Sequence, residues 1–447
     1  MLKSNSTYKY LDFVKFSQLY NWSVQYLNES KIRFTTKYPL VQIKEFLTRN
    51  KTAIEIQDDV YYKRATIKVR NGGIFLRDTV LGNKIGTKNQ FRISKGQFLL
   101  SKIDARNGAF GVVPEELDGG VITGNFWTFD VDYSKVNPHY LALLTTTNEF
   151  IGFCEQASNG TTNRHYLQEP LFLNIKVPLP SLAEQNKLVE EYNTYIDLSD
   201  SYKKECQKID NDIIQYFNKS IGLKKIVNKT QLLSFIRLKD ISTRWDSFAI
   251  TNLITAKVPI YPFSKFINNI ATGTTPPTSQ KGYFNGDIKF YTPADINGEK
   301  YLTTSERTLT QKAIIDKKAR SFHKGDILFV GIGSTVGKVG IVSDNIVTTN
   351  QQITGITLNN SILSPEYAFY YLHYHREITT ADHSKTTLPI VNQEKIANIP
   401  IPTPDISQQK DIVEQIDIMR DKIIKINQKA VEYRTKALKN FRTKIFE

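Results

Sequence analysis

The chain has 447 residues, and its Lys and Arg outnumber Asp and Glu by 59 to 44, which gives a net charge of +15. With 40% apolar and 23% charged residues, it has the composition of a globular protein of about three domains, which excludes wholesale disorder. It lacks the apolar runs of a membrane span or signal peptide, and 2 Cys are too few for a disulfide scaffold. We expect a soluble, cytoplasmic protein whose charge favours an acidic partner such as nucleic acid.

Short strands separated by turns are predicted for the first part of the chain. Turn signals at Asn71-Gly72-Gly73 and Lys95-Gly96 bound runs of β-branched and aromatic residues, the composition typical of strands. A short helix is expected at Pro138–Thr145. We therefore expect an α+β domain with a curved or barrel-like sheet. The predicted strands are Ala65–Val69, Gly73–Leu76 and Phe98–Ile103.

A long helix is predicted next. Pro178-Leu179-Pro180 ends the globular part, because proline resists helix continuation, and Ser181 with Glu184 forms an N-cap and N3 pair. The residues that follow repeat at spacings of four and three, as in the seam of a coiled coil. The seam positions are Leu188, Tyr192, Tyr195, Ser199, Tyr202, Cys206, Ile209, Ile213 and Tyr216.

The second half follows the same order. Strands are predicted at Ile288–Tyr291, Ile327–Val330 and Val339–Val342, and a short helix at Pro365–His373. Asp405 and Gln408 then cap a second long helix. Its seam positions are Ile412, Ile416, Met419, Ile423, Ile426, Ala430, Tyr433, Ala437 and Asn440.

Matching landmarks indicate that the chain contains a duplication. Each recurs in the same order at nearly one spacing, which predicts two copies of a domain and its connecting helix. The domains are placed at 1–180 and 223–404, and the helices at 181–222 and 405–447. The paired landmarks are Tyr38-Pro39 with Tyr261-Pro262, Lys95-Gly96 with Lys324-Gly325, Thr161-Thr162 with Thr386-Thr387, and Ser181–Glu184 with Asp405–Gln408.

The two long helices have matching lengths and heptad phases. We expect them to pack on each other as an antiparallel coiled coil, each spanning about 60 Å. The alternative is that each amphipathic helix packs separately on its own domain.

The sequence contains no recognisable catalytic motif. Gly331–Gly337 resembles a phosphate loop, but it has neither the G-x-G-x-x-G spacing nor a P-loop lysine, so a tight strand–turn–strand is favoured. His373 and His375 are two residues apart and would not face each other on a helix, so a shared metal ion is disfavoured. We expect no metal site and no enzyme activity in this chain.

These motifs resemble the specificity (S) subunit of type I restriction–modification systems. In the second half the resemblance rests on Ala271–Ser279, Tyr283–Asp295, Gly333–Gly340 and Thr349–Gln352. The first half is similar to a different target-recognition class, over Ser101–Gly111, Pro114–Gly119 and Pro178–Gln185. The resemblance covers nearly the whole chain.

The resemblance implies two target-recognition domains held by the coiled coil. The halves differ strongly over 40–92 and 263–320, which in this family implies two unrelated half-sites and hence an asymmetric, bipartite double-stranded DNA target. A rod of about 60 Å bounds the unread spacer at fewer than about 20 base pairs.

The resemblance also implies partners that carry out the chemistry. These are two methyltransferase (M) subunits that use S-adenosylmethionine, and restriction (R) subunits that use ATP and Mg, so no cofactor is expected on this chain. The outer faces of the coil would recruit the methyltransferases.

The candidate DNA-binding residues are polar and basic side chains in the matched loops. Arg, Lys and Asn suit base edges, whereas Ser and Thr more often contact phosphates. The candidates of the first half are Lys102, Arg106, Asn107, Thr161, Thr162, Asn163, Arg164 and His165. Those of the second half are Ser334, Thr335, Lys338, His383, Ser384, Lys385, Thr386 and Thr387.

Two other functions remain open on the sequence alone. One is a stand-alone DNA-binding or nucleotide-dependent enzyme that uses Gly331–Gly337, which a nucleotide titration would test. The other is a scaffold that joins proteins through the coil without DNA, which a salt-dependent DNA-binding assay would test.

Overall fold

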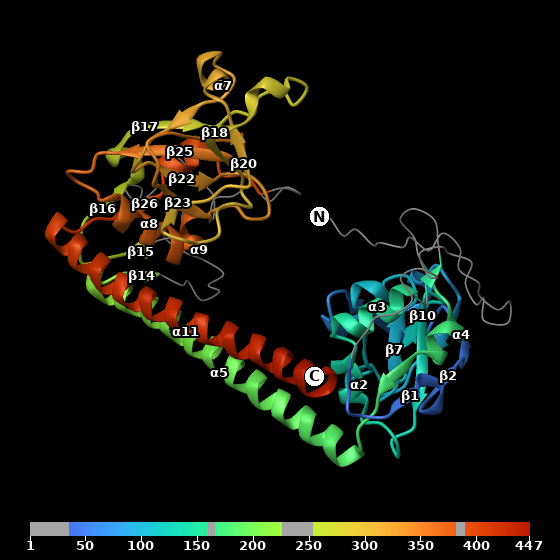
Figure 1. The fold of residues 1–447 in the computed structure, drawn as a ribbon. Coiled ribbons are helices and arrows are strands. Elements are labelled where there is room, and N and C mark those ends of the chain that lie inside the picture. Colours follow the sequence, from blue (N-terminus) through green and yellow to red (C-terminus); the bar gives the residue numbers. More distant parts are fainter. Residues whose placement is uncertain (1–34, 157, 160–165, 226–253, 381–388) are drawn as a thin grey trace, which may run out of the picture. The chain divides into compact units, whose positions relative to one another are not determined.

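The computed structural model describes residues 35–156, 158–159, 166–225, 254–380 and 389–447 (Figure 1). The chain divides into two compact units. The first contains residues up to Tyr202 together with Gln428–Glu447, and the second contains Lys203–Asn427.

The first unit contains an antiparallel sheet in the order β2-β10-β7-β8. All four residues of β7 are buried, because helices cover one face of the sheet and a second sheet covers the other. Phe98 and Leu100 face the helices, whereas Leu99 faces the second sheet. These elements are β2 (Leu47–Asn50), β7 (Phe98–Ser101), β8 (Phe110–Val112), β10 (Phe126–Val131), α2 (Pro138–Leu144), α3 (Asn148–Gln156) and α4 (Glu169–Asn174).

The second sheet of this unit has the order β3-β6-β9-β4-β5. Ile74, Ile93 and Val113 pack with Leu99 between the two sheets. Its strands are β3 (Ala53–Glu55), β4 (Tyr61–Lys68), β5 (Gly73–Leu81), β6 (Asn89–Arg92) and β9 (Val121–Ile122). Smaller elements are β1 (Leu40–Gln42), β11 (Ser158–Asn159), β12 (Tyr166–Leu167), β13 (Lys176–Pro178), η2 (Ile43–Glu45), η3 (Gly82–Lys84), η4 (Ala105–Asn107) and η5 (Glu115–Leu117).

The second unit contains a related sheet in the order β17-β25-β22-β23-β19 and another in the order β20-β18-β24-β21. Leu328 and Val330 of β22 pack between the two sheets, and α8 is almost entirely buried. The sheets consist of β17 (Ile267–Thr272), β18 (Phe284–Tyr291), β19 (Tyr301–Leu302), β20 (Arg307–Leu309), β21 (Ser321–Phe322), β22 (Ile327–Val330), β23 (Val339–Val342), β24 (Val347–Thr349) and β25 (Ile353–Leu358). The other elements are α7 (Gln311–Ile315), α8 (Pro365–Tyr374), α9 (Arg376–Thr379), α10 (Gln393–Ala397), β14 (Lys224–Lys225), β15 (Ile254–Thr255), β16 (Ile260–Pro262), β26 (Pro400–Pro402), η7 (Phe263–Phe266) and η8 (Lys281–Tyr283).

The strand order β2-β10-β7-β8 of the first unit recurs as β17-β25-β22-β23 in the second, which confirms the predicted α+β fold with two related domains. The second large sheet of each unit differs in strand number and order, with five strands in the first unit and four in the second. The parts of the chain that differ most between the halves therefore build most of the second sheet of each domain.

One predicted landmark of the repeat is wrong. Leu40 pairs with Pro178 and Ile260 pairs with Pro402, so Leu40 and Ile260 hold the same place. Tyr38-Pro39 therefore precedes its strand, whereas Tyr261-Pro262 lies within its strand. Backbone hydrogen bonds fix this register, and a dipeptide can recur without marking equivalent positions.

The two long helices are α5 (Leu182–Ile221) and α11 (Ile406–Phe446). Both caps form as predicted, because the Glu184 amide donates to Ser181 Oγ at 3.4 Å and the Gln408 amide to Asp405 Oδ1 at 2.8 Å. The expected reach of the N3 side chain back to the cap is replaced by other contacts. Gln408 Nε2 donates to the Ser220 carbonyl, and Glu184 accepts from Tyr38.

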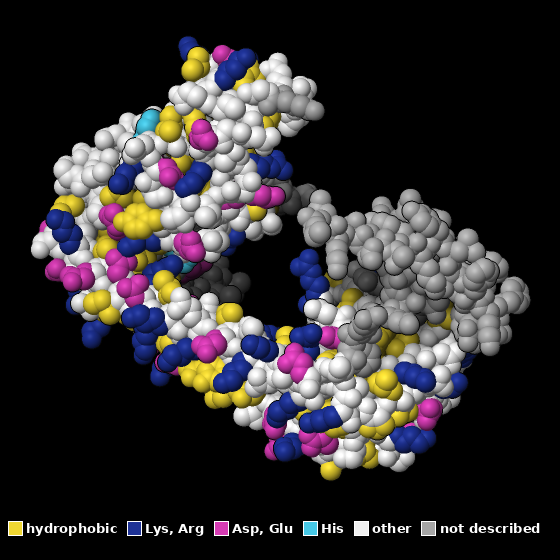
Figure 2. Space-filling view, viewed as in Figure 1, with side chains coloured by type: hydrophobic (Ala, Val, Ile, Leu, Met, Phe, Trp, Pro, Cys, Tyr) yellow, Lys and Arg dark blue, Asp and Glu magenta, His cyan; other side chains and the backbone are white. Residues whose placement is uncertain are grey.

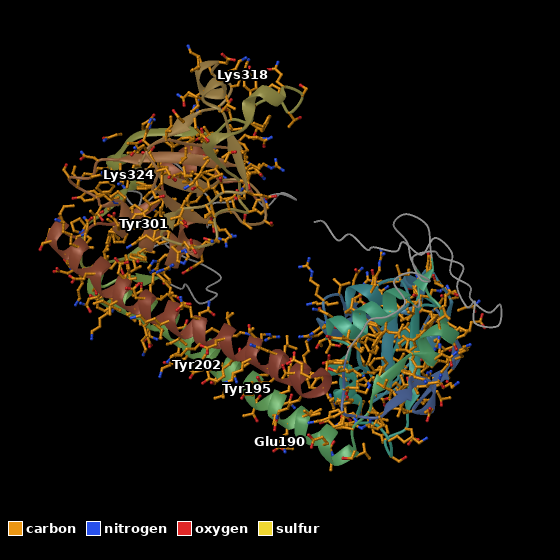
Figure 3. The ribbon with its side chains drawn as sticks, viewed as in Figure 1. Glu190, Tyr195, Tyr202, Tyr301, Lys318 and Lys324 are labelled. Atoms are coloured by element: carbon orange, nitrogen blue, oxygen red, sulfur yellow. The ribbon has the colours of Figure 1, made fainter. Side chains whose placement is uncertain are left out.

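The helices pair antiparallel in each unit and form the predicted coiled coil (Figure 1). In the first unit, Ser199 Oγ donates to the Ala430 carbonyl at 2.8 Å, and Tyr433 stacks on Tyr195 and Tyr202. In the second unit, Cys206 Sγ lies 3.7 Å from the Ile423 carbonyl oxygen. Every predicted seam position is buried or half-buried. Figure 3 shows Tyr195 and Tyr202 along α5.

Each domain is joined to the helices by a buried glutamine. Gln185 Nε2 donates to the carbonyls of Pro180 and Lys135, and its Oε1 accepts from the Asn137 amide at 2.8 Å. Gln409 makes the same three bonds in the second unit, with the carbonyls of Pro404 and Ile362 and the amide of Ser364. Both glutamines are 0% exposed.

The C-terminal end of each helix packs on a domain. Phe217 of α5 stacks on Tyr367 of α8, with ring centroids 5.3 Å apart. Phe441 of α11 contacts Tyr140 of α2 at the corresponding place, with tilted rings whose centroids are 5.8 Å apart. Among the described residues, no helix is long and apolar enough to cross a membrane.

Candidate nucleic-acid interface

The first group of candidate residues lies in the loop between β7 and β8. Lys102 follows β7 directly, and Arg106 and Asn107 lie in η4, which ends at Gly108 with a φ of 75°. Asn107 is exposed, whereas Lys102 and Arg106 are half-buried. A glycine suits this left-handed position, which turns the chain sharply back into β8.

The loop between β22 and β23 holds the same place in the second domain. Its last glycine, Gly337, also has a positive φ, of 87°. Ser334 is exposed, and Thr335 and Lys338 are half-buried. The structure therefore places the described candidates of both halves at one equivalent turn of the shared sheet.

The remaining candidates lie outside the described residues. These are Thr161, Thr162, Asn163, Arg164 and His165 in the first half, and His383, Ser384, Lys385, Thr386 and Thr387 in the second. The residues that follow each segment return to the candidate loops. The Leu167 amide donates to the Lys102 carbonyl, and the Val391 amide to the Gly331 carbonyl, each at 2.8 Å. The described residues Leu167 and Val391 thus bond to the loops before β8 and β23, respectively.

The glycine-rich turn Gly331–Gly337 does not have the form of a phosphate loop. It joins two antiparallel strands, whereas a phosphate loop presents free amides at a helix N-terminus. Here the amides of Gly331, Gly333 and Gly337 donate to carbonyls of the chain itself, at 2.8–3.1 Å. Arg376 Nε also donates to the Val336 carbonyl from α9. Because these amides are already bonded within the chain, they are not available to a phosphate group, which disfavours the nucleotide-dependent alternative.

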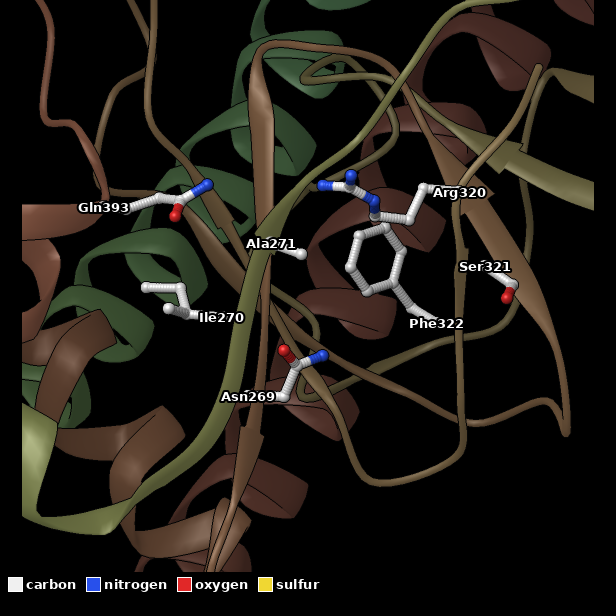
Figure 4. A pocket seen from close by; sticks show the side chains of 7 residues that line it. All are labelled: Asn269, Ile270, Ala271, Arg320, Ser321, Phe322 and Gln393. Atoms are coloured by element: carbon white, nitrogen blue, oxygen red, sulfur yellow. The ribbon is translucent and has the colours of Figure 1, made fainter. Parts of the chain in front are cut away.

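A hollow in the second domain lies between the edge strands β17 and β21 (Figure 4). Its volume is about 530 Å³, and Asn269, Arg320 and Gln393 contribute polar groups to its lining. Arg320 donates to the Thr272 carbonyl at 2.8 Å, and Gln393 to Thr272 Oγ1 at 2.8 Å. Amide and guanidinium groups are suited to base edges. Our candidates omitted all three residues, although Arg320 ends the basic run Lys317–Arg320.

A second hollow, of about 320 Å³, adjoins the candidate turn of this domain. Gly331, Gln351 and Asn392 are among its lining residues. Gln351 is exposed, and its Oε1 accepts a hydrogen bond from Thr275. The polar surface of the second domain thus extends from the turn to the edge of the sheet.

The close histidine pair belongs to the aromatic core of the second domain. His373 stacks on Phe369, while His375 contacts Asn218 through Nε2 at 2.7 Å. Burial, reinforced by Arg420 and Arg376, lowers the pKa of His373 to about 4. The part of the chain that the structure describes holds no cluster of three or more side chains able to bind a metal ion.

The positive charge is spread widely. Figure 2 shows Lys and Arg side chains over both units rather than in one patch. Lys318 projects beside α7 in the second domain (Figure 3). A dispersed charge of this kind suits long contacts with phosphates better than a single polybasic tail.

Comparison with known proteins identifies the family. The sequence model "Type I restriction modification DNA specificity domain" matches residues 24–225 and 266–432. The MjaIX type I restriction enzyme specificity subunit of Methanocaldococcus jannaschii is 31% identical over 36% of this chain and 37% of its own length. The putative MjaX specificity subunit of the same organism is 21% identical over 78% of this chain and 77% of its own length.

The fold agrees with this match. A solved chain from a study of complex assembly and conformational transition in the type I R-M system has a TM-score of 0.54 and 16% identity. The similarity covers 92% of this chain and 97% of that chain. With its family match, its duplicated domains and its paired helices, the chain belongs to the family of type I restriction–modification specificity subunits.

Proposed function

We propose that this chain selects the DNA sequence on which a type I restriction–modification complex acts, and that its target is bipartite and asymmetric. The observation that carries the proposal is that the two domains each contain a sheet of the same strand order but differ in their second sheet. Two domains with a common sheet order and different second sheets are suited to recognise two different half-sites.

The proposed division of labour follows the domain boundaries expected from the sequence. Residues 1–180 and 223–404 would each recognise a short sequence, and the helices at 181–222 and 405–447 would connect them. The names of the relatives, which are specificity subunits, support this role.

The proposed DNA contacts are the candidate loops of both domains. Lys102, Arg106 and Asn107 would serve the first half-site, and Ser334, Thr335 and Lys338 the second. The equivalent placement of the two loops supports a common approach to the duplex. The candidates at 161–165 and 383–387 are proposed for the same role on the sequence alone.

The partners proposed are two methyltransferase subunits and restriction subunits, with this chain itself non-catalytic. Support comes from the similar solved chain, which belongs to a study of how the type I R-M system assembles as a complex. S-adenosylmethionine, ATP and Mg would be used by those partners.

The test is a base-resolution methylation map of the host with and without the gene for this chain. Loss of methylation at one bipartite, asymmetric motif on deletion is expected, and would also give the bases and the spacer. Identical maps in a host whose methyltransferase subunit is shown to be active would contradict the proposal.

A further inference from the structure

A long two-stranded ribbon stands at the edge of the first domain's second sheet. β4 pairs with β5 from Tyr61 opposite Leu81 to Lys68 opposite Gly73, and β5 is the last strand of its sheet. Apolar side chains are exposed near its turn, with Val69 at 45% and Phe75 at 41%. The ribbon lies within residues 40–92, where the two halves of the chain differ strongly.

The tip of the ribbon has an unusual backbone. Arg70 and Asn71 have φ values of 58° and 55°, and the Gly72 amide donates to the Val69 carbonyl at 3.3 Å. Two successive positive φ values are the geometry of a tight hairpin turn, for which glycine and asparagine are preferred. An arginine at the first of these positions is locally unfavourable. The presence of Arg70 at a position where arginine destabilises the turn points to a role for the Arg70 side chain.

The tip of the ribbon, residues 69–72, is hydrogen-bonded to the candidate DNA-binding loop between β7 and β8. The Arg70 amide donates to the Asn107 carbonyl at 2.6 Å, and the Asn71 amide to the Gly108 carbonyl at 2.9 Å. The two segments are more than thirty residues apart in the sequence, and these bonds place them in one surface. Arg70 is exposed, as is Asn107 beside it.

The charge of the ribbon tip is entirely positive. Between Thr66 and Leu76 the sequence contains Lys68 and Arg70 but neither Asp nor Glu. The ammonium group of Lys68 lies over the ring of Phe75, 4.8 Å from its centroid. Because both Lys68 and Arg70 are exposed, this end of the domain attracts an anionic partner.

We propose that the tip at residues 69–72 inserts into the major groove of the first half-site, and that Arg70 reads a base there. The major groove, about 12 Å wide, admits a two-stranded ribbon, and a guanidinium pairs with O6 and N7 of guanine. The loop with Lys102 and Asn107 then contacts the flanking backbone or bases. This inference rests on the proposed function and assigns its first specificity residue to the ribbon.

The decisive variant is Arg70→Gly. Glycine adopts a positive φ freely, so the turn and the fold are retained while the guanidinium is removed. In methylation maps, one position of one half-site becomes degenerate, and the other half-site keeps its sequence. In competition binding by the assembled complex, discrimination at that position falls about tenfold or more. A melting temperature equal to or above that of the wild type verifies the fold.

Arg77→Ala is the matched control. Arg77 lies on the same ribbon, away from the tip, with its side chain 62% exposed. Removal of its side chain is expected to leave the recognised motif unchanged. Even where a side chain at this position contacts a phosphate, loss of that contact weakens binding to all sequences alike.

The outcomes separate the two proposals. A wild-type chain that directs no bipartite motif overturns the proposed function and this inference with it. A normal wild-type motif that persists with equal discrimination in Arg70→Gly overturns the inference alone. Relaxation of both half-sites together in a stably folded Arg70→Gly also overturns it, because a base contact acts at one position.

Discussion

At the residue scale, a buried glutamine near the start of each long helix connects that helix to its domain through the same set of hydrogen bonds. The side-chain amides of Gln185 and Gln409 each make three hydrogen bonds: Nε2 donates to two carbonyls, and Oε1 accepts from one backbone amide. Because its hydrogen bonds are satisfied, such an amide can be buried at a small free-energy cost, and its removal leaves its backbone partners unpaired.

We predict that Gln185→Ala lowers the free energy of unfolding by about 2–3 kcal/mol, because the Asn137 amide and two carbonyls lose their partner. Urea unfolding of the full chain would measure this. The control is Lys187→Ala, two residues along the same helix and exposed, which is expected to change stability by less than about 0.5 kcal/mol. Equal stability of Gln185→Ala and the control would contradict the prediction.

The half-buried imidazole of His373 predicts a loss of stability in mild acid. Its pKa is held at about 4 in the folded chain, chiefly by burial, against 6.5 in its ordinary state. The unfolded chain therefore takes up a proton that the folded chain does not, and stability falls as the pH drops from about 6.5 to 4. The linked loss is about 3 kcal/mol.

Unfolding measured across this pH range would test the prediction with His373→Phe, which keeps a ring between Phe369 and Tyr374 but cannot titrate. The variant should lose markedly less stability than the wild type between pH 6.5 and 4. The same acid dependence in both proteins would show that His373 is not its source.

At the element scale, small buried residues lie between the paired helices, among them Ser199 and Ala430. Ala430 is 0% exposed, and its carbonyl accepts the Ser199 hydroxyl. We predict that Ala430→Leu destabilises the pair by about 1–3 kcal/mol, because the added side chain has no space. Thermal unfolding followed by helical circular dichroism would measure it.

Val431 supplies the comparison, since it is 59% exposed one residue further along α11. Val431→Leu is expected to lie within about 0.5 kcal/mol of the wild type. Equal destabilisation by the two variants would mean that the helices do not pack at Ala430.

The helices were the most predictable elements. Their heptad spacing and caps are local signals, and both appear where the sequence placed them. The prediction missed Phe217 and Phe441, since it ended each seam one residue earlier. At those ends the helix also packs on a domain, where Phe217 contacts Tyr367 and Phe441 contacts Tyr140, so the apolar position faces the domain rather than the seam.

The candidate site was predictable only in part. The turn at Lys102 and its equivalent at Ser334 follow strands whose composition and bounding glycines can be read in the sequence. Arg70 could not be identified in this way, because its role depends on hydrogen bonds to a loop distant in the sequence. Arg320 and Gln393 were missed for the same reason, since sheet edges bring them together.

At the scale of the whole molecule, the helix pair predicts how the spacer of the target could be changed. One heptad added to α5 after Tyr202 and one to α11 after Ile426 keeps both seams in phase and lengthens each helix by about 10 Å. On the proposed function, the spacer should grow by about three base pairs, at 3.4 Å each.

A methylation map of the host carrying the lengthened chain would show the new motif. Insertion of three residues in each helix is the control, because it breaks the heptad phase and should abolish specific methylation. Full methylation of the original motif by the seven-residue variant would contradict the prediction.

The return of α11 also has a consequence for biosynthesis. Phe441, Ile445 and Phe446 are at most 4% exposed and belong to the core of the first domain. The ribosome makes them only after the entire second domain. The nascent first domain therefore carries an unfinished apolar face throughout that interval, when such surfaces are prone to aggregate. Its folding is completed only when α11 emerges, so a nascent chain that stalls before α11 is left with an exposed core.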